Sequence, residues 1–129
     1  MSTEIAYLVY VSTFTALLWV PYILDRFLVW GLLPTLGYPE NPPPQSGWAQ
    51  RAKKAHYNAV ENLVVFAALV LAVEIAGRAG PATAMACTLY FWARVVHYGA
   101  YTLGVSYLRT VAFLAGWAAQ IALALQLLG

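Results

Sequence analysis

Two uncharged stretches near the ends of the chain restrict the possible fold most. Ile5–Leu24 and Thr110–Gly129 contain no Asp, Glu, Lys or Arg, and each is long enough to cross the hydrocarbon core of a bilayer as a helix. Hydrophobic residues make up 62% of the chain and charged residues only 9%, which is more apolar than a water-soluble domain requires. Strands are not expected, because apolar and polar residues do not alternate. The sequence therefore predicts an all-α membrane protein.

Two further long, apolar segments lie between the uncharged stretches, at Ala55–Gly77 and Pro81–Leu103. We expect residues 1–129 to form a single domain, a four-transmembrane-helix up-down bundle. The helices are predicted at about residues 4–30, 47–77, 81–103 and 108–128, and Pro21 is expected to kink the first of them. The segment 31–46 is rich in proline and glycine and is predicted to be a cytoplasmic loop.

The basic residues are unevenly distributed along the chain. Most of them border the first connection or open the last helix: Arg26, Arg51, Lys53, Lys54 and Arg109. Arg78 is the only basic residue expected at the other end of the bundle. The positive-inside rule therefore places both termini outside and the proline-rich loop in the cytoplasm. Nucleic-acid binding is not expected, because no basic surface remains for it.

Polar residues recur on one face of the second and of the third predicted helix. Lys54, Asn58 and Glu61 have the spacing i, i+4, i+7 on the second helix. Arg94, His97 and Tyr101 share a face near the end of the third helix. The rise per residue places Glu61 roughly 10 Å deeper than Lys54 and Arg94 roughly 10 Å deeper than Tyr101, so the two charges are expected at a similar depth.

We expect Glu61 and Arg94 to form an ion pair, because either charge alone is costly in hydrocarbon. A purely structural pair and a direct ligand contact both remain open for these two residues. The concentration of polar side chains on the cytoplasmic half predicts a pocket that is open to the cytoplasm and suits an anionic, hydrogen-bonding ligand. A hydrophobic co-substrate could enter it from the bilayer.

Arg109 and Thr110 begin the last predicted helix, where free backbone N–H groups and the helix dipole favour anions. A guanidinium and a neighbouring hydroxyl could hold a bound thiol as the thiolate, which is the reactive nucleophile. The alternative is that Arg109 only reaches to the membrane interface.

Other chemistries fit the sequence poorly. His56 and His97 lack the paired Cys or carboxylate residues of a metal site, so no metal is expected. Neither a GxSxG motif nor a phosphate-binding glycine loop is present. Cys87, the only cysteine, is expected to be buried and unreactive.

Three motifs carry a resemblance to a known family. They are Arg51-Ala-Lys-Lys-Ala-His-Tyr-Asn-Ala-Val-Glu61, Arg94-Val-Val-His-Tyr-Gly-Ala-Tyr101 and Arg109-Thr110. Together they resemble the MAPEG family, the membrane-associated proteins in eicosanoid and glutathione metabolism, in a short bacterial-type form. Within the family the pattern is similar to the branch of microsomal glutathione transferase and microsomal prostaglandin E synthase. The resemblance covers about residues 6–128.

The resemblance implies a homotrimer in a membrane, the bacterial inner membrane for this form, with glutathione as co-substrate bound between subunits near the cytoplasmic face. It implies a glutathione transferase or glutathione-dependent peroxidase acting on lipophilic electrophiles or lipid hydroperoxides. The catalytic residues would be Arg109, which stabilises the thiolate, and Thr110. The residues implied to bind glutathione are Arg26, Lys54, Asn58, Glu61, His97, Tyr101 and Arg109. The alternative is a non-catalytic protein of the same fold that binds a lipid or a partner protein.

Overall fold

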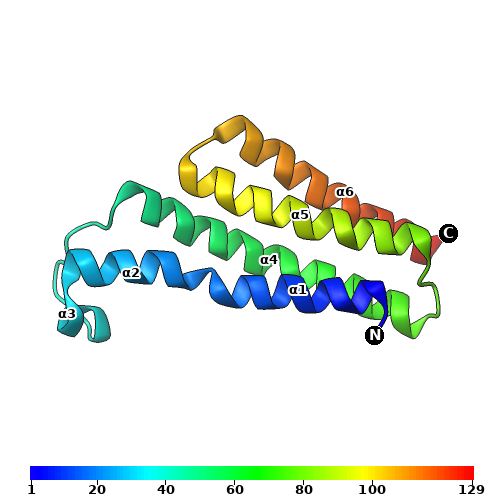
Figure 1. Cartoon of the computed structure of the whole chain (residues 1–129), viewed down its shortest axis with the longest axis horizontal. Helices are drawn as coiled ribbons and strands as arrows, with labels where there is room; N and C mark the ends of the chain where they lie inside the picture. Colours follow the sequence, from blue (N-terminus) through cyan, green and yellow to red (C-terminus); the bar gives the residue numbers. More distant parts are fainter.

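The computed structural model describes residues 1–129 and is built from helices alone. Their bounds are α1 Thr3–Leu17, α2 Trp19–Trp30, α3 Leu32–Leu36, α4 Gly47–Ile75, α5 Pro81–Leu103 and α6 Ser106–Leu128. Figure 1 shows α1 and α2 running along α4, and α5 and α6 packed as an antiparallel pair; α5 contacts both α4 and α1. Both termini lie at one end of the molecule, and the α2–α4 and α5–α6 connections lie at the opposite end.

Three helical stretches are long and apolar enough to cross a membrane: Thr3–Trp30, Gly47–Ile75 and Ser106–Leu128. The first of these comprises both α1 and α2. Helix α5, which carries Arg94 and His97, does not meet the same criteria. The length and composition of the helices therefore support an integral membrane protein with three candidate membrane spans, and the four predicted crossings stay a prediction.

The first helix is divided where we expected only a kink. The break lies at Leu18, whose N–H bonds to the carbonyl of Thr15 at 3.2 Å, in a tighter turn than an α-helix makes. Pro21 explains the position of this break. Proline has no N–H for the carbonyl four residues earlier, which belongs to Leu17, and its ring crowds that carbonyl.

The proline-rich segment contains one short helix, α3, and is tied to α2 along its length. The indole N–H of Trp30 donates to the carbonyl of Pro43 at 2.7 Å. The buried carboxylate of Asp25 accepts from the Ser46 hydroxyl at 2.6 Å and from the Ser46 backbone N–H at 3.1 Å. Gln45 also donates to Asp25, at 3.3 Å. Asp25 therefore fastens the residue that precedes α4 to α2.

Small residues and two stacked rings hold α4, α5 and α6 together. Phe66 and Tyr90 are fully enclosed and stack with ring centroids 3.9 Å apart. Gly116 of α6 faces α5, where a Cβ atom would meet Arg94 Cδ at 3.7 Å and Ala93 Cβ at 3.8 Å. Such small side chains let helix backbones approach closely, which is a common way to pack helices in a bilayer. Cys87 is fully buried in the same core.

The attachment of α4 to Asp25 generates a prediction about stability. Asp25→Ala removes the acceptor of three hydrogen bonds and should lower the free energy of unfolding by about 1–3 kcal/mol. Thermal unfolding of the detergent-solubilised protein measures the loss. Glu40→Ala, which removes an exposed carboxylate from the same connection, is the matched control. Equal stability of the two variants would show that the Asp25 contacts do not hold the loop.

Candidate functional site

Two of the cavities toward the end of the bundle that carries the α2–α4 and α5–α6 connections contain residues predicted from the sequence and exceed about 300 Å³ in volume. The first, which we name the interhelical cavity, has a volume of about 360 Å³ and is formed by one residue of α4 with residues of α5 and α6. Its lining residues are Asn58, His97, Tyr101, Arg109, Thr110, Phe113 and Leu114. It contains an arginine and no carboxylate, so it favours an anionic ligand.

Arg109 is the charged residue in the wall of the interhelical cavity. It lies in the first turns of α6 and is half-buried, and its guanidinium carbon is 4.8 Å from the centre of the Tyr101 ring. No side chain caps the start of α6, so its first backbone N–H groups are free to bind an acceptor. Stacking on an aromatic ring restrains the guanidinium while leaving its N–H donors available.

Thr110 does not present its hydroxyl proton to the cavity. The Thr110 hydroxyl donates to the carbonyl of Ser106, one turn earlier in α6, at 3.1 Å. A threonine in a helix commonly satisfies its hydroxyl in this way. Of the two residues predicted to be catalytic, Arg109 is therefore the one whose side-chain donors remain free.

The expected ion pair between Glu61 and Arg94 does not form within the chain. Arg94 is buried, and one of its terminal nitrogens donates to Asn58 Oδ1 at 2.7 Å and lies 3.2 Å from His97 Nδ1. Glu61 is exposed on the surface of α4. Successive residues of a helix are rotated by about 100°, so Glu61 is displaced by about 60° around the axis from Asn58. Similar depth was therefore not sufficient to bring the two charges together.

A chain of amides continues from this arginine towards the middle of the bundle. Asn62 donates from Nδ2 to the backbone carbonyl of Asn58 at 2.9 Å and to Asn58 Oδ1 at 3.3 Å. Gln120 of α6 in turn donates to the backbone carbonyl of Asn62 at 3.1 Å. The polar interior thus links α4, α5 and α6 without an acidic residue.

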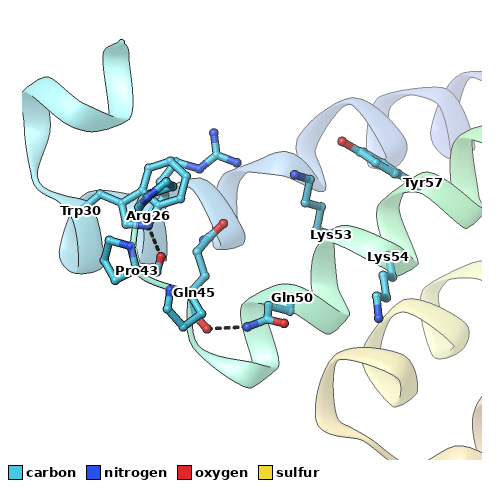
Figure 2. Close-up of a pocket in the computed structure, with 10 residues that line it drawn as sticks. Arg26, Trp30, Pro43, Gln45, Gln50, Lys53, Lys54 and Tyr57 are labelled. Atoms are coloured by element: carbon cyan, nitrogen blue, oxygen red, sulfur yellow. Dashed lines mark hydrogen bonds between the residues drawn. The ribbon is translucent and has the colours of Figure 1, made fainter. Parts of the chain in front are cut away.

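The second cavity, which we name the loop cavity, lies between α2, α4 and the proline-rich segment and has a volume of about 520 Å³ (Figure 2). Its lining residues are Arg26, Trp30, Pro42, Pro43, Pro44, Gln45, Gln50, Lys53, Lys54 and Tyr57. The guanidinium of Arg26 packs 4.8 Å from the centre of the Trp30 ring. Figure 2 shows Lys53 and Tyr57 projecting from α4 towards α2, whereas Lys54 points in another direction.

The model of the MAPEG family matches residues 5–129, which is nearly the whole chain. The chain belongs to the MAPEG family. No curated protein matches it.

The residues that the MAPEG resemblance singled out are divided between different parts of the structure. Five of them line the interhelical cavity: Asn58, His97, Tyr101, Arg109 and Thr110. Arg26 and Lys54 line the loop cavity, which shares no lining residue with the first. Glu61 lines neither of these two cavities. Within one chain of this MAPEG protein, the predicted residues therefore do not form one continuous site.

Sequence reasoning missed several residues of both cavities. Phe113 and Leu114 complete the interhelical cavity one turn beyond Arg109 and Thr110, and this spacing was a signal that could have found them. Gln45 and Pro43 reach the loop cavity only because the proline-rich segment folds back on α2, and no helical spacing foretells that. The hydrogen-bond partners of Arg94 were not predicted, because Asn58 was interpreted only as a ligand-binding residue.

The contact between Asn58 and Arg94 generates a second prediction. Asn58→Leu leaves a buried guanidinium without its closest acceptor and should lower the free energy of unfolding by about 1.5–3 kcal/mol. Asn58→Asp keeps an acceptor of the same shape and should retain the stability of the parent chain. Denaturant titration of the two variants in detergent measures the difference. Equal destabilisation by Leu and by Asp would exclude this hydrogen bond as the cause.

Proposed function

We propose that this MAPEG protein binds glutathione near the cytoplasmic face of the membrane and uses it on lipophilic substrates. The observation that carries the proposal is the interhelical cavity, in which Arg109, Asn58 and His97 face a common space without a carboxylate. A volume of about 360 Å³ is within the usual range for small-molecule sites. Apolar helix surfaces surround it, so a hydrophobic co-substrate has access from the bilayer.

Arg109 would hold the sulfur of glutathione as a thiolate. The guanidinium and the free N–H groups at the start of α6 stabilise the negative sulfur, and the thiol proton passes to solvent. In a transferase reaction the thiolate attacks an electrophilic carbon, a carbon–sulfur bond forms, and either a leaving group departs or the product takes up a proton. The hydrogen bond of Thr110 to Ser106 leaves the stabilisation of sulfur mainly to Arg109.

Reduction of a lipid hydroperoxide would start from the same thiolate. Sulfur attacks the terminal peroxide oxygen, the O–O bond breaks, and the lipid leaves as its alcohol after taking up a proton. The sulfenic acid of glutathione then reacts with a second glutathione and yields glutathione disulfide and water. Both reactions need the same held thiolate, so the cavity supports them equally.

The substitution of Arg109 tests this role. Arg109→Ala should abolish the thiolate absorbance in the ultraviolet that appears when glutathione is added to the purified protein, because no other cation lines the cavity. It should also reduce turnover of an electrophile such as 1-chloro-2,4-dinitrobenzene by about 100-fold or more, the usual effect of losing one electrostatic stabiliser. Arg78→Ala, which removes an exposed arginine at the other end of the bundle, is the control. Unchanged absorbance in Arg109→Ala would remove this residue from the mechanism.

The second candidate function is non-catalytic binding of a lipid or a partner protein by the same fold. One observation favours it: the side chain of Phe113 gives the cavity wall a ring without a hydroxyl, beside a threonine whose proton is already engaged. Under this alternative, glutathione produces neither a thiolate signal nor a rise in the unfolding temperature.

We further propose that α5 is a fourth membrane crossing and that the protein is a homotrimer. With 23 residues, α5 is about 35 Å long, which is enough for the hydrocarbon core. In a trimer, the loop cavity of one subunit would approach the interhelical cavity of its neighbour, and this would explain why the predicted residues are divided within one chain. The distribution of basic residues supports termini outside the cytoplasm.

Mixed trimers test whether the site is shared between subunits. If Arg26 of one subunit and Arg109 of its neighbour serve one glutathione, Arg26→Ala and Arg109→Ala should each weaken binding throughout the trimer. Co-expression of the two variants should restore about a third of the sites in trimers purified by both tags, because every three-membered ring that contains both variants has one junction with an intact Arg26 and an intact Arg109. Titration calorimetry on co-purified, differently tagged subunits counts these sites. An absence of restored sites would show that each site lies within one subunit.

A further inference from the structure

Arg94 is a buried cation whose hydrogen-bond partners are neutral. Arg94 is 3% exposed, and one of its terminal nitrogens donates to Asn58 Oδ1 at 2.7 Å and to His97 Nδ1 at 3.2 Å, whereas its buried Nε has no partner within the chain. The cavity lies on the far side of these partners, since Asn58 and His97 line it and Arg94 does not. A buried guanidinium in this position acts on a bound ligand only through the two side chains that it holds.

The contact with Arg94 determines which nitrogen of His97 carries the proton. A guanidinium has five N–H donors and no acceptor. His97 Nδ1 must therefore be the acceptor, and the neutral ring carries its proton on Nε2. The other groups around the ring are Tyr101, Phe113 and the second cation, Arg109. None of them is a carboxylate that would favour a doubly protonated ring.

The same reasoning fixes the side-chain amide of Asn58. Its oxygen accepts from Arg94 at 2.7 Å and from Asn62 at 3.3 Å, so both neighbours of that atom are donors. A rotated amide would set its NH₂ group against a guanidinium and lose both hydrogen bonds. The amide nitrogen of Asn58 is therefore left as a donor on the side away from Arg94.

We infer that Arg94 is a positioning residue that sets His97 as an Nε2–H donor and Asn58 as an amide donor towards the interhelical cavity. Together with Arg109, they give the cavity donors from α4, α5 and α6. Such a lining recognises an acceptor-rich anionic group, a carboxylate or a thiolate, and discriminates against an ammonium group. The identity of the ligand as glutathione rests on the proposed function, whereas the orientation of the donors does not.

Nitrogen-15 NMR of histidine tests the inference without any ligand. The chain has only His56 and His97, so the parent protein and a His56→Gln variant, labelled with ¹⁵N-histidine in detergent micelles, suffice to assign the ring signals. We expect His97 to show a non-protonated Nδ1 and a protonated Nε2. A protonated Nδ1 in the parent protein would overturn the inference, whatever happens to any variant.

Two arginine variants separate positioning from general stability. Arg94→Met should release Nδ1, so that the His97 signals become those of mixed tautomers or of a doubly protonated ring. Arg78→Met should leave the signals of the parent protein unchanged. Unchanged His97 signals in a folded Arg94→Met protein would also overturn the inference.

Glutathione binding supplies the last measurement. If the parent protein binds glutathione, Arg94→Met should raise Kd about tenfold, the value of one hydrogen bond to a charged group, although Arg94 does not line the cavity. Parent-like affinity in Arg94→Met would overturn the positioning role. If the parent protein binds no glutathione but shows the Nε2–H tautomer, the proposed function fails and the inferred orientation of the donors stands.

Discussion

A buried guanidinium held by neutral acceptors is the interaction on which the rest of this structure depends. Arg94 could not remain inside the bundle without Asn58 and His97, because an unpaired buried charge is very costly. Because the acceptors are the side-chain amide of Asn58 and the imidazole of His97, the N–H groups of these two side chains are left as oriented donors at the edge of the bundle interior. The stability of the bundle and the binding character of the cavity thus have the same origin.

The contacts among α4, α5 and α6 change from apolar to polar along the bundle. At the end that holds the termini, α4, α5 and α6 pack through the apolar side chains Val70, Val73, Cys87 and Leu123. Helix α1 adds a polar contact at the same end, where the buried Glu4 carboxylate accepts from the Thr83 hydroxyl at 2.9 Å. At the opposite end the helices are joined by amides, arginines and the segment tied to Asp25. The apolar contacts make the packing of α4, α5 and α6 rigid, so helices set the positions of the hydrogen-bond donors in the polar half. The loop cavity also depends on a connection, the proline-rich segment.

The sequence was sufficient for features that depend on a single segment. Uncharged stretches predict membrane helices, Pro81 predicts the start of α5, and Gly104, with φ of 78°, ends it in the left-handed conformation that suits glycine. The sequence was insufficient for features that depend on how one helix is rotated relative to its neighbour. The hydrogen-bond partners of Arg94 are such a feature. Sequence spacing shows how deep a residue lies and which face of its helix it occupies, but it does not show which neighbouring helix that face contacts. The closure of the proline-rich segment over Arg26 depends on Asp25 and Ser46, which are far apart in sequence and lack any shared pattern.

The enclosure of Cys87 has a consequence for chemistry that consumes or produces thiols. It is the only cysteine in the chain and it is fully buried in the apolar core, about 15 Å from His97 by the rise along α5. Disulfide exchange needs an accessible thiolate. A protein that handled glutathione and its disulfide would therefore have no thiol of its own within reach, and it could work in an oxidising pool without becoming cross-linked or capped.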